Sequence, residues 1–385
     1  MEISITGENK VSEVLDVTFD VRQHEIIYPQ HFNGMLKHGT DMGVSDFYIS
    51  CQRQIKGKLH GKNQYFTKFD VTETHVNKLC ELIYGSAGVS ARLVGDGLPC
   101  SYQFKINQKT YRYRVNMMKA IRGAYIVMRP LDGIPPKLGT LGMESEIIKA
   151  FVSMCNHRED DTQGKMFVVA GETGSGKSTS ISSLVRYMVE ESELRDIGLN
   201  IYSSEAPVEY RYDEVDDGRA VLEQFEKFKG FTTFAGAVRS FMRMDPDVII
   251  VGETRDYETL DSVIQASNTG HVAVTTIHAN SISQIVTRMV DLASTEAKSD
   301  SDIKRVLESI GVAVFQKLMP TKSIDGKKGG RVAIREYLVF TNKVRQHLID
   351  NIQHLSQATQ YCVENYGRSF EQHKLELIQS GVIDG

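Results

Sequence analysis

A complete phosphate-binding pattern lies near the middle of the chain. Residues 171–178 read Gly-Glu-Thr-Gly-Ser-Gly-Lys-Ser, the spacing of a loop whose backbone N–H groups surround a phosphate. An apolar, partly β-branched run at 166–170 indicates a buried strand, and apolar residues at helical spacing follow over 179–190. Because both flanks fit, a chance glycine turn is the weaker alternative. The predicted ATP-binding residues are Gly171, Glu172, Thr173, Gly174, Ser175, Gly176, Lys177, Ser178 and Thr179.

Two members of this loop have side chains with specific chemistry. Lys177 can neutralise the β- and γ-phosphates, and the hydroxyl of Ser178 can bind Mg²⁺. The glycines allow backbone angles that other residues avoid, so that consecutive N–H groups face one anion. The positive end of the following helix adds to this field. The loop therefore predicts ATP and Mg²⁺ as cofactors.

A carboxylate at the end of an apolar run is the second strong signal. Residues 248–251 are β-branched and apolar, which predicts a buried central strand, and Glu253 follows. If this strand neighbours the one before the phosphate loop, Glu253 lies beside the phosphates, where it can orient or activate water. The alternative is an acid that caps the next helix.

Two carboxylates and two histidines give weaker signals. Glu205 and Glu209 follow a predicted strand at 199–203 and could hold Mg²⁺ through water or position the nucleophile, although a solvated loop explains them equally well. His271 and His278 bracket a predicted strand at an odd spacing, which does not predict a shared metal site. A histidine at a strand end can sense a γ-phosphate, and two ordinary polar residues are the alternative.

Basic residues gather before residue 131. One interpretation is a face exposed to solvent or a surface for acidic docking. The other is a set of arginines that reach an ATP bound nearby, for example in another subunit. These residues are Arg112, Arg114, Arg122 and Arg129.

The composition limits the class of protein. The chain has 385 residues, 41% of them hydrophobic, which suffices for two or three domains and a sizeable core. Its formal net charge of −4 argues against bulk nucleic-acid binding. Five scattered cysteines without a Cys-x-x-Cys pair indicate neither a zinc site nor a disulfide framework. With no apolar run near the ~18 residues of a membrane span and no signal-peptide pattern, we expect a cytoplasmic protein.

The predicted elements divide at a stretch rich in proline and glycine, 132–142, which reads as a linker. Residues 1–131 predict a small α+β domain with an antiparallel sheet, and residues 143–385 alternate strands and helices, which predicts an α/β fold with a mostly parallel sheet. The predicted strands are 44–50, 54–60, 64–69, 101–106, 110–117, 125–129, 166–170, 199–203, 247–251, 271–276, 312–317 and 330–340. The predicted helices are 28–38, 72–84, 86–94, 143–155, 177–190, 232–244, 256–267, 282–293, 301–310, 343–355 and 369–380, and 326–329 reads as a turn.

Four motifs occur in an order that resembles the type II/type IV secretion ATPases, a family that includes the pilus-retraction ATPases of the PilT kind. Residues 171–179 resemble its Walker A motif, 205–209 its Asp box, 243–256 its Walker B motif and 269–279 its His box. The resemblance runs from about residue 40 to the C-terminus. It implies a PAS-like N-terminal domain, a RecA-like P-loop ATPase core and a homohexameric ring.

The resemblance also implies roles for individual residues. Three arginines would contact nucleotide phosphates, one glutamate would be catalytic with two others in support, and two histidines would link nucleotide state to conformation. In that order they are Arg114, Arg122 and Arg129; Glu253 with Glu205 and Glu209; and His271 and His278.

Two departures from the family pattern narrow the resemblance. Ala206 stands where the Asp box has an aspartate, which shifts weight to Glu205, and residues 344–348 replace the Ala-Ile-Arg motif of retraction ATPases. Residues 330–339 look more like the type IVB secretion ATPases, the DotB kind, and the conjugative-transfer ATPases of I-type plasmids.

The resemblance then implies an ATPase that powers secretion or conjugation at the inner membrane, with the proteins of that machinery as partners and no direct nucleic-acid binding. The alternatives are a pilus-retraction motor, a RecA-like nucleic-acid motor and a nucleotide-gated scaffold.

Overall fold

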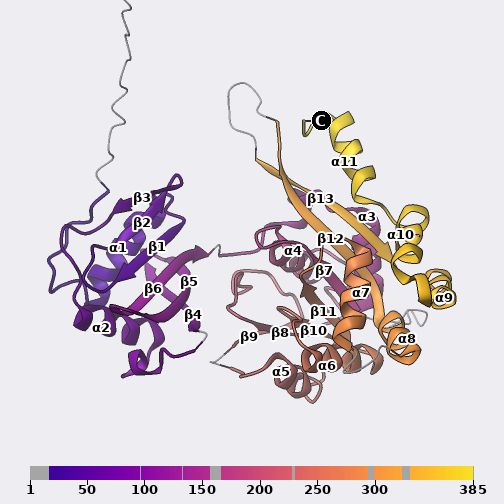
Figure 1. Ribbon diagram of the computed structural model, residues 1–385, viewed down its shortest axis with the longest axis horizontal. Coiled ribbons are helices and arrows are strands. Elements are labelled where there is room, and N and C mark those ends of the chain that lie inside the picture. Colours follow the sequence, from indigo (N-terminus) through magenta and orange to yellow (C-terminus); the bar gives the residue numbers. More distant parts are fainter. Residues whose placement is uncertain are drawn as a thin grey trace, which may run out of the picture. The chain divides into compact units, whose positions relative to one another are not determined.

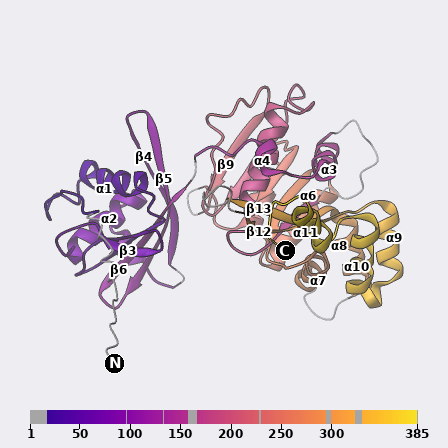
Figure 2. The ribbon, with the colours of Figure 1, turned by 90° about the horizontal axis from the view of Figure 1, so that it is seen from above.

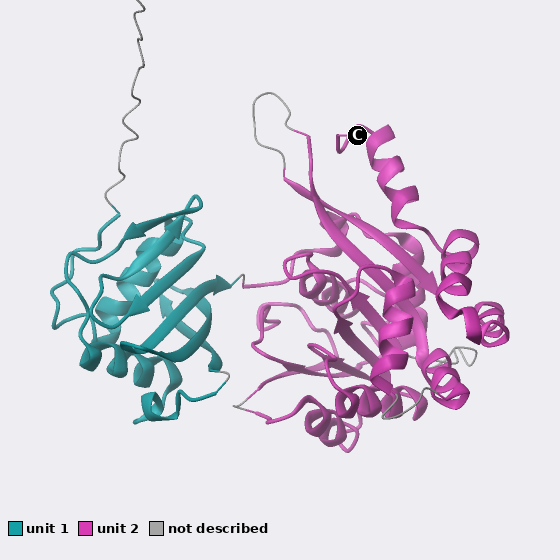
Figure 3. Ribbon diagram, in the orientation of Figure 1, with its two compact units in different colours: residues 1–131 teal, residues 132–385 magenta. Residues whose placement is uncertain are grey.

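The computed structural model describes residues 17–95, 97–131, 133–156, 166–227, 230–293, 299–322 and 330–384. The turn expected at 326–329 lies outside these ranges. The chain forms two compact units, residues 1–131 and 132–385 (Figure 3). In the described ranges, no helix is long and apolar enough to cross a membrane.

Unit 1 is built on an antiparallel sheet whose described strands run in the order β3-β2-β1-β6-β5-β4 (Figure 1). One face packs on α1 and α2, where Phe47 and Tyr113 of the sheet are buried with Phe32 and Leu79 of the helices. The bounds are α1 Pro29–Asp41, β1 Asp46–Ser50, β2 Lys56–Leu59, β3 Lys62–Tyr65, α2 Glu73–Tyr84, β4 Leu98–Ile106, β5 Lys109–Ala120 and β6 Gly123–Leu131.

Two details of unit 1 differ from the sequence prediction. Leu59 pairs with Lys62, so β2 and β3 are joined by His60 and Gly61. Both residues have positive φ, +49° and +79°, as a two-residue hairpin turn of the favoured type requires. The helix expected at 86–94 is a single 3₁₀ turn, Val89–Arg92, which follows a left-handed glycine at 88.

Unit 2 contains a sheet whose described strands run in the order β13-β12-β7-β11-β10-β8-β9. All neighbouring pairs are parallel except β12 and β13, as the alternation of strands and helices predicts. The strands are β7 Met166–Ala170, β8 Asn200–Glu205, β9 Val221–Glu226, β10 Val248–Val251, β11 Val272–Ile277, β12 Ile310–Pro320 and β13 Arg331–Val339. The helices are α3 Ser145–Cys155, α4 Lys177–Glu190, α5 Phe234–Phe241, α6 Tyr257–Asn268, α7 Ile282–Ala293, α8 Asp300–Ser309, α9 Asn342–Asp350, α10 Leu355–Tyr366 and α11 Phe370–Gln379.

Helices cover both faces of this sheet (Figures 1 and 2). Alternate residues of β7 enter two different cores because side chains of a strand point to opposite faces. Phe167 and Val169 are buried with α3 and α4, whereas Met166 and Val168 are buried with helices α5 to α10. Packing on both faces therefore holds in place the C-terminal ends of the parallel strands, where the phosphate loop begins.

Two elements of unit 2 were missed from the sequence. The apolar residues of the edge strand β9, Val221, Leu222 and Phe225, do not alternate regularly, and the strand is recognisable by its parallel pairing with β8. The helix expected at 343–355 ends at Asp350, and α10 follows as a separate helix. Small buried residues such as Ala358 and Cys362 form the inner face of α10, which gives a weak periodic pattern.

Each of the five cysteines lies in the described ranges as a free thiol with a buried side chain. Burial raises the pKa of the Cys51 and Cys362 thiols, and it raises the pKa of Cys80 to about 12. These thiols are therefore protonated at neutral pH.

Candidate nucleotide site

The phosphate loop connects the end of β7 to the first turn of α4. Gly171, Gly174 and Gly176 have φ values of +151°, +80° and +86°, which side chains with a Cβ rarely adopt. A Cβ on Gly171 would lie 2.3 Å from the Gln316 carbonyl oxygen, and one on Gly176 would lie 2.9 Å from Gln316 Nε2. These two glycines therefore allow the loop to lie against β12, while the outer side of Gly174 is open.

The side chain of Lys177 lies within its own loop. Its Nζ donates to the carbonyl oxygens of Gly171 and Glu172, at 2.7 and 2.9 Å. Burial lowers the pKa of Lys177, and the nearby carboxylates of Glu253 and Glu209 oppose this shift. The ammonium group is thus held where an anion in the loop would meet it.

The donors around the loop fit a polyphosphate. Ser175 Oγ is buried and has no hydrogen-bond partner within the described residues. Because α4 begins at Lys177, its first N–H groups have no partner inside the helix. Buried donors without partners carry a desolvation cost that phosphate oxygens would remove. ATP therefore fits the loop on the chemistry of its donors.

Magnesium fits as a companion of such a nucleotide. The described residues contain no group of three or more His, Cys, Asp or Glu side chains able to hold a metal. Mg²⁺ is commonly held by one or two protein ligands together with phosphate oxygens and water. Ser178, in the first turn of α4, is the residue that the phosphate-loop pattern assigns to it.

Glu253 lies near the phosphate loop although its strand does not neighbour the strand before the loop. Strand β11 lies between β7 and β10, so the strands before the loop and before Glu253 are not neighbours. The segment after β10 still brings the carboxylate close enough to act on Lys177. Arg255 Nη2 lies 2.6 Å from Oε2, and His278 Nε2 lies 3.1 Å from Oε1 without hydrogen-bond geometry. Helix α6 is capped by Asp256, which accepts from Thr259 N at 2.8 Å, so the helix-cap alternative for Glu253 is wrong.

Threonines of β11 hold the segment that carries Glu253. Thr276 Oγ1 donates to the Gly252 carbonyl at 2.6 Å, and Thr254 N donates to the Thr276 carbonyl at 2.9 Å. The hydroxyls of Thr254 and Thr275 are 2.7 Å apart in a hydrogen bond. Strand β11 thus positions Glu253 near the phosphate loop, although β7 and β10 are not adjacent in the sheet.

The two histidines lie at opposite ends of strand β11. His278 follows the C-terminal end of β11, on the side of the phosphate loop, and contacts Glu253. His271 precedes β11, and its Nδ1 lies 3.0 Å from Thr269 Oγ1 and 3.2 Å from the Ala266 carbonyl. Because β7 and β11 are parallel, the phosphate loop is at the other end of the strand from His271. His271 therefore lies away from the phosphate loop, and its role in linking nucleotide state to conformation stays a prediction.

The two carboxylates of the Asp-box segment have different surroundings. Glu205 ends β8 and accepts hydrogen bonds from Ser203 Oγ at 2.8 Å and Gln224 Nε2 at 3.0 Å. Burial raises the pKa of Glu205, so it does not belong to a solvated loop. Glu209 is the member of the pair whose charge acts on Lys177. Glu205 is thus held by hydrogen bonds at the end of β8, and Glu209 is the carboxylate nearer in effect to Lys177.

The arginines of unit 1 do not form one cluster. Arg114 and Arg129 are opposite each other on β5 and β6, and Arg129 binds Asp46 Oδ1 through Nε and Nη2 at 2.9 and 2.8 Å. Arg122 is exposed in the turn that joins the two strands, about 24 Å along the strand from Arg114 at the usual rise. Arg112 is buried near the other end of the hairpin, where it pairs with Leu131.

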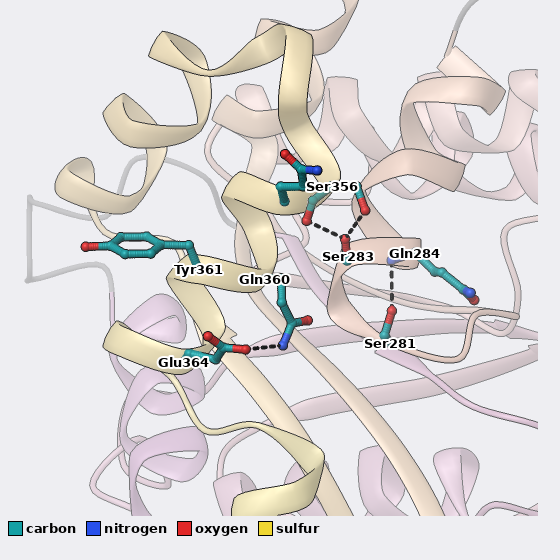
Figure 4. A pocket seen from close by; sticks show the side chains of 8 residues that line it. Ser281, Ser283, Gln284, Ser356, Gln360, Tyr361 and Glu364 are labelled. Atoms are coloured by element: carbon teal, nitrogen blue, oxygen red, sulfur yellow. Dashed lines mark hydrogen bonds between the residues drawn. The ribbon is translucent and has the colours of Figure 1, made fainter.

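A second hollow, of about 500 Å³, lies between α7 and α10 in unit 2 (Figure 4). Its polar side chains bind one another: Ser283 Oγ donates to the Ser356 carbonyl at 2.8 Å, and Gln360 Nε2 donates to Glu364 at 2.8 Å. The Ser283–Ser356 bond holds α10 against α7, and the Gln360–Glu364 bond lies within α10, so the hollow is explained by helix packing.

Similarity to known proteins decides the family of this chain. The sequence model of the type II/IV secretion system protein family matches residues 91–384. This chain belongs to that family. The secretion ATPase is 30% identical over 273 residues to the type IV pilus retraction ATPase PilT of Pseudomonas aeruginosa, which covers 71% of each chain.

Solved structures of DotB ATPases share its fold. The Legionella pneumophila ATPase DotB aligns with a TM-score of 0.80 and 30% identity over 92% of this chain and 93% of that one. The Yersinia pseudotuberculosis ATPase DotB aligns with a TM-score of 0.73 and 25% identity over 96% and 93%. The likeness therefore extends over both units of the secretion ATPase.

Two site residues of the secretion ATPase were missed from the sequence. Arg255 lies inside the Walker B segment, next to Glu253, and its proximity to that acid was a usable signal. Gln316 was a lone amide in the predicted strand 312–317, and a polar residue in a buried strand needs a partner. Its partner is the phosphate loop.

We expect Arg255→Gln to lower kcat about 2- to 5-fold with an unchanged KM for ATP, because a mostly exposed ion pair contributes little energy. The Arg255 side chain is 72% exposed and contacts Glu253 from outside. Steady-state ATP hydrolysis measures the effect, with Arg288→Gln, an exposed arginine of α7, as the control. A loss above 100-fold would instead place Arg255 on the reacting atoms, and no change would deny it any positioning role.

Proposed function

We propose that this chain is the hexameric cytoplasmic ATPase of a type IVB secretion or conjugative-transfer apparatus, associated peripherally with the inner membrane. The observation that carries the proposal is the likeness to DotB over more than nine tenths of both chains at 30% identity. In this proposal, unit 2 is the RecA-like core, unit 1 is the PAS-like domain, and residues 132–142 link them. The partners are five further copies and the proteins of the membrane machinery.

The residues of the site have distinct roles in the proposed reaction. ATP with Mg²⁺ would supply the phosphoanhydride bond and the charge of the metal. Lys177 would exchange the carbonyls of Gly171 and Glu172 for phosphate oxygens, while Ser178 holds the metal. Glu253 would orient the attacking water and accept its proton. The charges of Glu253 and Glu209 oppose the lowering of the Lys177 pKa by burial. His278 contacts Glu253 and would link its position to the state of the nucleotide.

A pilus-retraction motor is the second candidate, and the similarity to PilT favours it. The two candidates predict different losses in the cell that carries this gene. A Lys177→Ala allele would abolish export or conjugative transfer and leave surface motility intact if the first proposal is correct. The reverse pattern would make the chain a retraction motor. The RecA-like nucleic-acid motor predicts strong, salt-dependent DNA affinity, and the scaffold predicts negligible steady-state turnover.

We further propose that arginines of unit 1 act on the nucleotide of a neighbouring subunit, with Arg122, exposed in the β5–β6 turn, as the first of the predicted three to test. Arg122→Ala should then lower kcat strongly, because a charge contact that strengthens in the transition state is lost. Rings mixed from Arg122→Ala and Lys177→Ala subunits should recover activity, since about a quarter of randomly formed interfaces combine both intact residues. Lys119→Ala, an exposed cation near the same turn, is the control. No recovery in rings shown by mass spectrometry to be mixed would contradict action between subunits.

A further inference from the structure

The side chain of Gln316, in the strand that lies against the phosphate loop, holds this loop by a hydrogen bond. It lies in β12, and its side chain is 1% exposed. Its Nε2 donates to the Ser175 carbonyl at 2.6 Å, and its Oε1 accepts from Ser180 Oγ at 2.8 Å. One amide therefore binds both the loop and the first turns of α4.

The bond to Ser175 fixes the direction of the next amide. A trans peptide is planar, so the C=O of Ser175 and the N–H of Gly176 point in opposite directions. Because Gln316 binds the carbonyl, the N–H of Gly176 points away from β12. This is one of the N–H groups with which the phosphate-loop pattern surrounds an anion.

Arg335 holds Gln316 in turn. The two residues are partners in the β12–β13 register, and Arg335 Nε donates to Gln316 Oε1 at 3.1 Å. Arg335 is also 1% exposed, and burial lowers its pKa while Glu144 opposes that shift. A cation at this position polarises the amide of Gln316 and strengthens its bond to the loop.

The remaining donors of Arg335 bind the segment before α3. Nη2 donates to the Leu141 carbonyl at 3.2 Å, and Nη1 donates to the Gly142 carbonyl at 3.0 Å and to Glu144 Oε2 at 3.4 Å. Glu144 also pairs with Arg368, and Arg368 Nη1 lies 2.8 Å from Glu376 of α11. A chain of polar contacts thus runs from Ser175 through the buried Gln316 and Arg335 to residues 141–144. It continues through Arg368 to Glu376 of α11, whose side chain is 55% exposed.

We propose that Gln316 and Arg335 are positioning residues, which aim the phosphate loop at the nucleotide and transmit its occupancy to residues 138–144 and α11. Lys177 must leave the carbonyls of Gly171 and Glu172 to meet a phosphate, so the loop changes its internal bonds on binding. A movement of Ser175 displaces Gln316, whose Oε1 is shared with Arg335. This inference rests on the proposed function in that the loop binds nucleotide.

Two substitutions separate positioning from folding. Arg335→Met removes the cation, whereas Gln316→Glu keeps the oxygen that Arg335 binds and loses the donor to Ser175. Gln316→Glu should raise the KM for ATP about 3- to 10-fold, the value of one hydrogen bond between neutral groups. Arg335→Met should raise it about tenfold, the value of one bond to a charged group, and kcat should stay within about 3-fold in both. The control is Arg345→Met, a buried arginine that donates to the Ile310 carbonyl at the far end of β12. An unchanged KM in Gln316→Glu, the variant that retains the pair with Arg335, would overturn the positioning role.

Hydrogen exchange of the full-length chain tests the transmission. Amides of 138–144 and of α11 should exchange more slowly with saturating ADP in the wild type, and Arg335→Met should remove this difference at saturating ADP. A merely structural arginine would change exchange equally with and without ADP. If hydrogen exchange in the wild type is the same with and without bound ADP, the proposed transmission is wrong while nucleotide binding stands. Equilibrium dialysis measures the binding of ADP separately. A wild-type chain that binds no ADP would overturn the proposed function as well.

Discussion

Lys177→Ala is expected to reduce ATP hydrolysis by at least about 10²- to 10³-fold, the usual cost of removing one preorganised donor from a developing charge. The ammonium of Lys177 is half-buried inside the loop and bonded to two of its carbonyls, so no other side chain can take its position. Steady-state hydrolysis by the purified chain measures the loss.

The control for this change is Lys149→Ala, which removes an exposed lysine of α3. Both variants should keep the circular dichroism spectrum of the wild type, because each removes a side chain outside the hydrophobic cores. Wild-type turnover in a folded Lys177→Ala protein would show that catalysis takes place elsewhere on the chain.

Glu253→Gln should bind ATP with wild-type affinity and hydrolyse it about 10²- to 10⁴-fold more slowly, the range attributed to general acid–base catalysis. The amide has the shape of the carboxylate but cannot take a proton from water. Its side chain is 18% exposed and lies among Arg255, His278 and Lys177, so little solvent is available to replace it.

Nucleotide affinity and kcat are measured separately on this variant. Glu258→Gln changes an exposed acid in the first turn of α6 and is the matched control. A collapse of ATP affinity with kcat preserved would give Glu253 a structural role in the site instead.

Local patterns predicted the elements that carry the phosphate loop. Strand β7 and helices α4 and α7 begin and end at the expected residues, because long apolar periodicity and the glycine loop act within a few residues of sequence. The choice of Glu253 also rested on a local pattern, the apolar strand followed by an acid. The structure brings it near Lys177 as expected.

Strand order and contacts between distant residues were beyond such patterns. The position of β11 between β7 and β10 depends on pairing across more than 100 residues. His271 and Arg122 show that neighbours in sequence can be far apart in space, because His271 lies at the end of β11 away from the phosphate loop and Arg122 at the opposite end of the β5–β6 hairpin from Arg112. The contact of Arg335 with Glu144 spans 191 residues, and neither residue stands out in its own segment.

The burial of all five cysteines has a practical consequence for chemical labelling. A folded chain presents no reactive native thiol, since each is enclosed and maleimides need access to a thiolate. A cysteine placed in the exposed β5–β6 turn would therefore carry a fluorophore alone on an otherwise native background. The same native thiols become accessible when the chain opens, so their rate of alkylation reports unfolding without any added probe.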